Sequence, residues 1–130
     1  MLFLKIVPCP FCTPKPEDII YRNALWYTRW DAFPATPGHV LVIPFRHCPD
    51  IFSTTLEEQA ALPEMLFSTR ALLEERFAPA GYNIVINTGA AADQRVMHCH
   101  VHLIPRYNEK SKNPPDGIRG FVMERPEKVL

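Results

Sequence analysis

Three histidines occupy alternate positions in the run His98-Cys99-His100-Val101-His102. The surrounding stretch, from Val96 to Ile104, is rich in aliphatic and β-branched side chains and predicts a β-strand. Successive side chains of a strand point to opposite faces, so the three imidazoles would share one face with Val96 and Ile104. The intervening residues would face a core: Met97, Cys99, Val101 and Leu103. An ordinary strand does not need three titratable groups on one face, so the pattern indicates a functional site on a sheet.

A zinc ion bound by all three histidines is one interpretation of this face, because zinc sites with three imidazoles exist. Strand geometry opposes it, since His98 and His102 would stand roughly 13 Å apart and zinc–nitrogen bonds measure only about 2.0–2.1 Å. The alternative is nucleophilic catalysis at phosphorus, with neutral His100 attacking and His102 bonding a phosphoryl or leaving-group oxygen. An imidazole is neutral near pH 7 and leaves readily once phosphorylated, so the second chemistry is expected.

Further strands are predicted on both sides of a central segment. The aromatic and β-branched stretch 19–31 predicts a hairpin with its polar break at Arg22-Asn23. The apolar stretch 39–44, bounded by proline, predicts a short strand that is covered on both faces. Residues 82–88 predict another strand before the histidine run.

One long helix is predicted between these strands. Thr55 and Glu58 form a capping box at its start, and Ala80-Gly81 is the expected end. Pro63 is expected to bend or split it near its first turns. Apolar side chains at helical spacing form one stripe: Leu62, Leu66, Leu73 and Phe77. Strands, then a helix, then strands predict an α+β domain, an antiparallel sheet of about five strands with the helix on one face.

The composition restricts the class of partner. The chain has 130 residues, enough for a single domain over residues 1–130, with 47% apolar and 22% charged residues. Fourteen Lys and Arg balance fourteen Asp and Glu, so we expect a small-molecule partner and neither a nucleic acid polymer nor a membrane. Residues 1–8 lack the features of an export signal, which predicts a cytoplasmic protein. Residues 107–130 are expected to form a loop and a C-terminal tail.

Residues 94–106 resemble the signature of the histidine triad (HIT) family, Gln-x-Val-x-His-x-His-x-His-x-x followed by Pro-Arg. Upstream, Asp31 with Pro37-Gly38-His39 and Pro44-Phe45-Arg46-His47 is similar to the nucleotide-pocket segment of that family. Asn87-Thr88-Gly89 stands at the family's usual distance before the triad. The resemblance extends from about residue 9 to residue 106.

The resemblance implies roles for individual residues. His100 would be the nucleophile that forms a nucleotidyl-histidine intermediate, His102 would bind phosphate, and His39 would support the histidine row from behind. Asp31 would bind ribose hydroxyls. Two further residues would contact phosphates: Asn87 and Gln94. The family also implies a homodimer in which two sheets join into one.

The resemblance implies a substrate with a scissile bond at the α-phosphate, either a dinucleoside polyphosphate or a nucleoside phosphoramidate. Pro105-Arg106 resembles the polyphosphate hydrolase branch, which is the one expected here. Asp93 and Arg95 depart from the family, which usually has glycine and serine or threonine at these positions. Arg95 could bind additional phosphates through its guanidinium or be a solvated loop residue. The residues themselves explain no role for Asp93.

A second site is indicated by Cys9-Pro10-Phe11-Cys12, in which the two thiols have the spacing of zinc ligands. Some members of the family complete such a site with histidines that match His47 and His98, which implies a structural Zn²⁺ that anchors residues 1–18. Cys48 in place of His47 is an alternative ligand. The thiol pair could instead be buried or redox-active without metal. Cys99, on the opposite face of the predicted strand, is expected to be a core residue.

Two other functions remain open. A nucleotide-binding adaptor would keep the pocket without turnover, although the retention of all three histidines argues against it. A nucleotidyl transferase would keep His100 and pass the nucleotide to an acceptor other than water.

Overall fold

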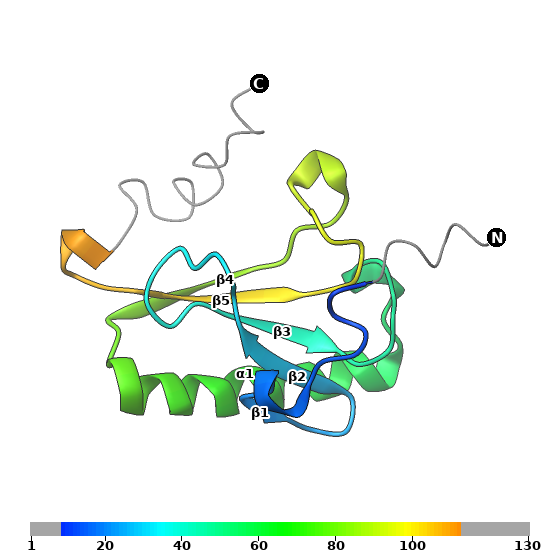
Figure 1. Cartoon of the computed structure of the whole chain (residues 1–130), viewed down its shortest axis with the longest axis horizontal. Coiled ribbons are helices and arrows are strands. Elements are labelled where there is room, and N and C mark those ends of the chain that lie inside the picture. Colours follow the sequence, from blue (N-terminus) through cyan, green and yellow to red (C-terminus); the bar gives the residue numbers. More distant parts are fainter. Residues whose placement is uncertain (1–8, 113–130) are drawn as a thin grey trace.

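The computed structural model of the chain describes residues 9–112, which form one antiparallel sheet with a single long helix packed on one face (Figure 1). The elements are β1 (Tyr21–Arg22), β2 (Trp26–Trp30), β3 (Val40–Pro44), α1 (Leu56–Phe77), β4 (Gly81–Val85) and β5 (Val101–Arg106). The strand order is β1-β2-β3-β5-β4. The predicted α+β architecture with five strands is confirmed. The predictions for residues 1–8 and for the tail after residue 112 lie outside the described residues.

Helix α1 begins at the predicted capping box. The Glu58 amide donates to Thr55 Oγ1 over 3.1 Å, and the Thr55 amide donates to Glu58 Oε1 over 2.8 Å. The helix runs without interruption through Pro63, so the predicted split is wrong. This proline is exposed and removes a single backbone hydrogen bond, which the packing of the remaining turns offsets. Within residues 9–112 no helix has the length and apolar character needed to cross a bilayer.

The helix ends earlier than predicted, at Phe77. Its C-cap is Ala78, which adopts a left-handed conformation with φ 47° and donates its amide to the Glu74 carbonyl. This conformation is usually adopted by glycine, so the predicted end at Ala80-Gly81 was too late. Gly81 instead begins β4.

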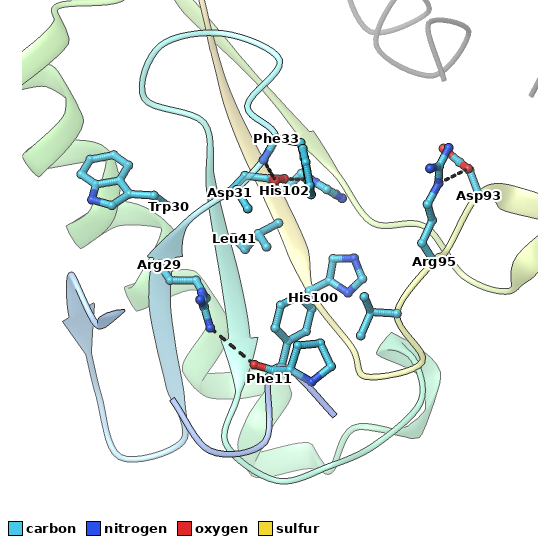
Figure 2. A pocket seen from close by; sticks show the side chains of 13 residues that line it. Phe11, Arg29, Trp30, Asp31, Phe33, Leu41, Asp93, Arg95, His100 and His102 are labelled. Carbon is cyan, nitrogen blue, oxygen red and sulfur yellow. Dashed lines mark hydrogen bonds and ion pairs between the residues drawn. The ribbon is translucent and has the colours of Figure 1, made fainter. Parts of the chain in front are cut away.

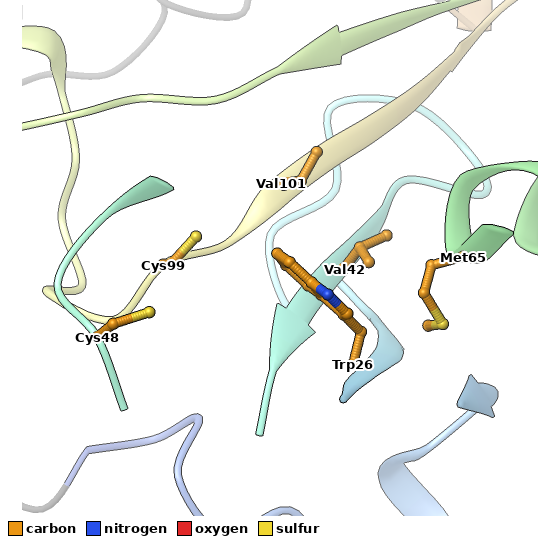
Figure 3. Packing of buried hydrophobic residues seen from close by; sticks show 6 residues of the cluster. All are labelled: Trp26, Val42, Cys48, Met65, Cys99 and Val101. Carbon is orange, nitrogen blue, oxygen red and sulfur yellow. The ribbon is translucent and has the colours of Figure 1, made fainter. Parts of the chain in front are cut away.

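One face of the sheet packs against α1 and forms the main core. Met65, Thr69 and Leu73 are the buried apolar and hydroxyl side chains of the helix. Trp26 is fully buried, and its indole donates to the Glu58 carbonyl over 2.8 Å. Figure 3 shows the cluster around this residue: Trp26, Val42, Cys48, Met65, Cys99 and Val101. Cys99 is therefore a core residue, as predicted.

The register of the strands determines which side chains lie on the face of the sheet away from α1. β2 and β3 pair from Trp26 with Pro44 to Trp30 with Val40, and Leu41 of β3 pairs with His102 of β5. Alternation then places the side chains of Arg29, Leu41 and His102 on the face away from the helix. Every residue of β3 is buried, which confirms the prediction of a strand covered on both sides.

The strand β5 begins at Val101, five residues later than the predicted start at Val96. The preceding backbone groups have other partners: the Cys99 amide donates to the Cys48 carbonyl over 2.7 Å, and the His98 carbonyl accepts from the His100 ring. These bonds replace the ladder of a regular strand. The predicted alternation of faces nevertheless holds from Cys99 to Ile104, whereas Met97 is exposed and not part of the core. β4 likewise ends at Val85, before the predicted Thr88.

Candidate functional site

A pocket of about 350 Å³ lies on the sheet face away from α1 (Figure 2). The loop between β2 and β3 delivers Asp31 and His39 to this face as neighbours, since the Asp31 amide donates to the His39 carbonyl over 3.0 Å. Gly38 makes this turn possible with φ 87°, and a Cβ there would stand 3.1 Å from the Phe77 ring. The lining includes four predicted site residues: Asp31, Arg95, His100 and His102.

His100 is held in one orientation by the backbone. Its Nδ1 lies 2.8 Å from the His98 carbonyl oxygen, which can only accept, so Nδ1 carries the proton. The neutral ring then has its lone pair on Nε2. His100 is 8% exposed, and the Phe11 ring packs at an angle to it with centroids 5.2 Å apart. An oriented imidazole with a nucleophilic nitrogen in a pocket is suited to attack on an electrophile.

His39 and His102 form a chain with a defined direction. The Ala35 amide donates to His39 Nδ1 over 2.9 Å, so the neutral His39 ring carries its proton on Nε2. That nitrogen lies 2.9 Å from His102 Nδ1, which then accepts. His102 consequently carries its own proton on Nε2 and can donate it to a ligand oxygen. The sequence predicted that His39 supports the three histidines, and in the structure His39 contacts one of them, His102.

Asp31 reaches both of these histidines. Its Oδ2 is 3.3 Å from His39 Nε2 and 3.7 Å from His102 Nδ1, while Oδ1 accepts the Phe33 amide over 2.8 Å. Asp31, His39 and His102 are close enough to surround a metal ion. A metal there would displace the proton of His39 Nε2, which the Ala35 amide places on that nitrogen. We therefore interpret this group as a hydrogen-bonded chain.

Asn87 and Gln94 do not line the pocket. Asn87 is half-buried after the end of β4. The buried Gln94 amide bonds three backbone groups: the Gly89 amide at 2.7 Å, the Pro49 carbonyl at 2.5 Å and the Val96 carbonyl at 3.0 Å. Gln94 thereby fixes the loop before β5. The phosphate contacts of both residues stay a prediction.

Asp93 and Arg95 both line the pocket, and they contact each other. Arg95 Nε donates to Asp93 Oδ1 over 3.0 Å. The Asp93 side chain is 3% exposed and that of Arg95 is 36% exposed. Arg106, in the Pro-Arg element, lies outside the pocket lining and donates to Asn83 on β4 over 2.7 Å.

The second predicted site is also brought together, with donor atoms of Cys9, Cys12, His47 and His98 all within 4.8 Å of one another. His98 Nδ1 lies 3.2 Å from Cys9 Sγ, 3.5 Å from Cys12 Sγ and 3.1 Å from His47 Nδ1. Cys12 Sγ lies 3.3 Å from His47 Nδ1. Ligands of a tetrahedral zinc ion stand about 3.3–3.8 Å apart at ordinary bond lengths, so this donor set fits zinc.

The protonation of His98 supports the same conclusion. Its Nε2 lies 2.8 Å from the Pro44 carbonyl oxygen and therefore carries the proton, which leaves the lone pair of Nδ1 directed at the cluster. Burial lowers the pKa of His98, so the ring is neutral near pH 7, as a ligand must be. Burial, with a contribution from Cys9, raises the pKa of the Cys12 thiol to about 11, and a bound cation would reverse this effect by stabilising the thiolate.

Cys48 does not belong to this cluster. It is buried in the core beside Cys99, and burial raises the pKa of both thiols, that of Cys99 to about 12. Neutral thiols in an apolar core are poor metal ligands. His47 thus lies in the cluster with Cys9, Cys12 and His98, whereas Cys48 does not.

Several pocket residues were not predicted from the sequence. The largest omission is Phe11, which lies between the two cysteines and packs against both His98 and His100. Others lie within two residues of a predicted site residue in the chain: Pro10, Arg29, Trp30, Phe33 and Leu41. The aromatic residues around Asp31 were a visible signal for an apolar ligand surface.

Three curated proteins are similar in sequence over most of this chain. An uncharacterized 16.1 kDa HIT-like protein of Mycoplasma pneumoniae is 45% identical over 104 residues, which cover 76% of this chain and 72% of that protein. The asymmetrical bis(5'-nucleosyl)-tetraphosphatase of Schizosaccharomyces pombe is 37% identical over 93 residues, 72% of this chain and 51% of that enzyme. The purine nucleoside phosphoramidase of Escherichia coli is 33% identical over 90 residues, which cover 68% of this chain and 76% of that enzyme.

Solved structures agree on the fold. A Zn-bound histidine triad family protein from Mycobacterium smegmatis superposes with a TM-score of 0.65 and 30% identity, over 94% of this chain and 88% of that one. Residues 13–109 match the family described as HIT domain, which is most of the chain. The chain therefore belongs to the HIT domain family, as its histidine run indicated.

Proposed function

We propose that this protein hydrolyses nucleotides at the α-phosphate through a covalent nucleotidyl-histidine intermediate on His100. The observation that carries the proposal is the bond from His100 Nδ1 to the His98 carbonyl, which assigns the lone pair to Nε2 in a pocket large enough for part of a nucleotide. Relatives named as a tetraphosphatase and a phosphoramidase support chemistry at a nucleotide phosphate.

In the first step, His100 Nε2 forms a bond to the α-phosphorus and the bond from phosphorus to the leaving group breaks. The electron pair of that bond departs with the leaving group. The modified ring becomes an imidazolium, and its Nδ1–H continues to donate to the His98 carbonyl, whose dipole stabilises the new positive charge. The Nε2–H of His102 would donate to a phosphoryl oxygen as charge accumulates there.

In the second step, a water oxygen attacks the same phosphorus and the bond from phosphorus to Nε2 breaks. The electron pair returns to the His100 ring, and the proton of the water is released to solvent. The products are a nucleoside monophosphate and the original leaving group, with one water consumed. His39 keeps His102 in the donating tautomer throughout, because its own Nδ1 is fixed by the Ala35 amide.

The nucleoside would occupy the side of the pocket that contains Asp31, whose carboxylate is suited to bonding ribose hydroxyls. Apolar and aromatic surface for the base would come from Trp30, Phe33 and Leu41. Asn87 and Gln94 remain proposed phosphate contacts. Gln94 would have to exchange a backbone bond for a phosphate, so we expect its main contribution to be the shape of the loop.

We also propose a structural Zn²⁺ bound by Cys9, Cys12, His47 and His98. When bound, the metal would tie the N-terminal segment to the catalytic residues, because His98 supplies both a ligand nitrogen and the carbonyl that orients His100. The zinc-bound relative with 30% identity supports this assignment. Reduced thiols are required as ligands, which agrees with the expected reducing, cytoplasmic compartment.

The proposed homodimer would use β4, an edge strand of the sheet. Ile84 is 53% exposed on this strand and Ile86, just after it, is 38% exposed. An exposed apolar edge strand favours pairing with another strand. Sedimentation analysis should give the mass of two chains, and Ile84→Lys should shift the species toward the mass of one.

Of the possible substrates, dinucleoside polyphosphates are the proposed class. The test is product analysis with diadenosine tetraphosphate and, separately, adenosine phosphoramidate, in water enriched in heavy oxygen. We expect AMP and ATP from the first substrate, with heavy oxygen in the AMP only, because water attacks the α-phosphorus. His100→Ala should lower turnover on the order of 10⁴-fold or more while its melting temperature and zinc content stay near those of the unmodified protein.

Other outcomes would identify other functions. Faster cleavage of the phosphoramidate would assign the protein to phosphoramidase chemistry. Tight AMP binding without turnover of either substrate would favour an adaptor, and nucleotide transfer to an added alcohol in preference to water would favour a transferase. Near-native hydrolysis by His100→Ala would refute the proposed mechanism.

A further inference from the structure

The loop between β4 and β5 contains an unusual backbone position at Asp93. Asp93 has φ 72° and ψ 24°, a left-handed conformation, and follows the short 3-10 turn Ala90–Ala92. Glycine adopts this conformation without strain, whereas for other residues it carries a cost that aspartate and asparagine tolerate best. The sequence thus places a carboxylate where a residue without a side chain would fit the backbone more easily.

The carboxylate of Asp93 is used inside the protein. It is 3% exposed and accepts from Arg95 Nε over 3.0 Å, so a buried negative charge is compensated by a guanidinium two residues later. Burial of a carboxylate is costly unless it is paired and hydrogen-bonded. Asp93 and Arg95 therefore act as one unit, in which the aspartate fixes the direction of the arginine side chain.

This unit forms a wall of the same pocket as His100 and His102. In the view of Figure 2, His100 lies between the Asp31–His102 group and the Asp93–Arg95 pair. If the nucleoside lies against Asp31, the group displaced from the α-phosphorus extends toward Arg95. Arg95 bonds Asp93 through Nε, and a guanidinium, with five N–H donors in a planar fork, is a group suited to binding two phosphate oxygens at once.

We propose that the Asp93–Arg95 pair is a specificity determinant that selects substrates with an anionic, phosphate-containing leaving group. Arg95 binds the phosphate next to the scissile bond, and Asp93 is the positioning residue that aims it. This inference rests on the proposed attack of His100 at the α-phosphorus. It assigns the substrate class to nucleoside polyphosphates bonded through an oxygen bridge and disfavours phosphoramidates.

The chemistry of the two leaving groups explains the selection. When a phosphoanhydride is cleaved, the electron pair of the broken bond adds negative charge to the departing phosphate oxygen, and a guanidinium stabilises that charge more in the transition state than in the substrate. When a phosphoramidate is cleaved, the leaving nitrogen must gain a proton to depart as an amine. The positive charge of Arg95 beside the leaving group stabilises neither the proton that the nitrogen must gain nor the neutral amine that departs.

The test measures kcat and KM of purified zinc-loaded protein for diadenosine tetraphosphate and adenosine phosphoramidate. Arg95→Ala should lower kcat/KM for the tetraphosphate about 10- to 100-fold, the range of a hydrogen bond to a charged group, with part of the loss in kcat. The value for the phosphoramidate should change less than about threefold, since no contact to an anion is lost. Asp93→Gly should also lower kcat/KM for the tetraphosphate, but by less than Arg95→Ala. Asp93→Asn, which keeps an acceptor for Arg95 Nε, should lower it less than Asp93→Gly.

Arg70→Ala is the matched control, because it removes one arginine from the exposed surface of α1, where the side chain is 62% exposed and paired with Glu74. This variant should leave kcat/KM unchanged for both substrates. Equal losses for both substrates in Arg95→Ala, or no loss for either, would overturn the specificity role while leaving hydrolysis through His100 intact. Absence of turnover of both substrates by the unmodified protein would instead overturn the proposed function and this inference with it.

Discussion

Two clusters of side chains both take imidazoles from residues 98–102 and differ in chemistry. The proposed metal cluster consists of Cys9, Cys12, His47 and His98, and the proposed catalytic cluster of Asp31, His39, His100 and His102. In the metal cluster the lone pair of His98 Nδ1 points at two thiols and a second imidazole. In the catalytic cluster donors and acceptors alternate from a backbone amide through His39 to His102. In each imidazole, the hydrogen-bond partner of one ring nitrogen fixes the tautomer, and the tautomer decides whether the second ring nitrogen accepts or donates.

The two clusters meet at His98 and at Phe11. The carbonyl of His98 orients the His100 ring, while the side chain of His98 belongs to the metal cluster. Phe11 lies between the cysteines, lines the pocket, and packs against the rings of both His98 and His100. The proposed metal cluster is thus part of the support of the proposed nucleophile, although a metal bound there would take no part in the proposed chemistry.

Removing a proposed metal ligand is expected to have the widest effect, because it should change metal content, thermal stability and activity together. Cys12→Ser should lower the zinc content from about one ion per chain to well below that. It should lower the melting temperature by roughly 10 °C, and kcat/KM about 10- to 100-fold, as the carbonyl of His98 and the ring of Phe11 lose their anchor. Metal analysis, thermal unfolding and hydrolysis assays measure these effects.

Cys48→Ala is the matched control for this variant, because Cys48 is a core thiol outside the metal cluster. The zinc content of Cys48→Ala should equal that of the unmodified protein. Full metal content in Cys12→Ser, or loss of metal in Cys48→Ala, would show that the ligands have been assigned to the wrong residues.

A change in the catalytic cluster alone should affect activity without affecting the metal. His39→Leu removes the donor to His102 Nδ1, so the tautomer of His102 is no longer fixed, and we expect kcat to fall about 100-fold. His39→Gln, whose amide can donate, should recover part of this loss. Zinc content should be unchanged in both variants. An unaltered kcat in His39→Leu would show that the chain through His102 is not needed.

The smallest effect is expected at the ion pair of Glu58 with Arg46, the residue before His47 in the chain. Arg46, through its hydrogen bond, holds the pKa of the buried Glu58 carboxyl below its usual value. A depressed folded pKa stabilises the protein above the unfolded pKa of about 4.3, and this stabilisation is lost as pH falls through the folded value. Glu58→Gln should therefore lower the melting temperature by a few degrees at pH 7.

The same Glu58→Gln variant should approach the stability of the unmodified protein as the pH falls through the depressed folded pKa of Glu58, since both side chains are neutral below it. Thermal unfolding over a series of pH values measures the difference. A difference that stays constant with pH would mean that the charge of Glu58 contributes nothing and that only its shape matters.

Much of this molecule was predictable because local rules and tertiary structure agree. The capping box placed the helix start at Thr55, and the register of alternate histidines placed three imidazoles on one side of the sheet. The gathering of Cys9, Cys12, His47 and His98 followed from two cysteines and a family resemblance. In each case a local pattern is reinforced by the packing that surrounds it.

Other features depend on partners that are distant in sequence. The late start of β5 reflects the bond from the Cys99 amide to Cys48, 51 positions away, and no local pattern contains it. The helix stop at Ala78 uses a conformation that alanine rarely adopts. Phe11 contacts His100 only because the N-terminal segment folds over the sheet. The pairing of Asp93 with Arg95 depends on the left-handed conformation that Asp93 itself adopts after the preceding turn.

The most direct test of the account is to trap the intermediate on His100. A dinucleoside polyphosphate with a radiolabelled α-phosphate should be mixed with the zinc-loaded protein and quenched in base within the first turnover, followed by peptide mapping. We predict covalent label on the peptide that contains His100 and none in His100→Ala. Turnover of the unmodified protein with no covalent label, or with label on another residue, would contradict the assignment of His100 as the nucleophile.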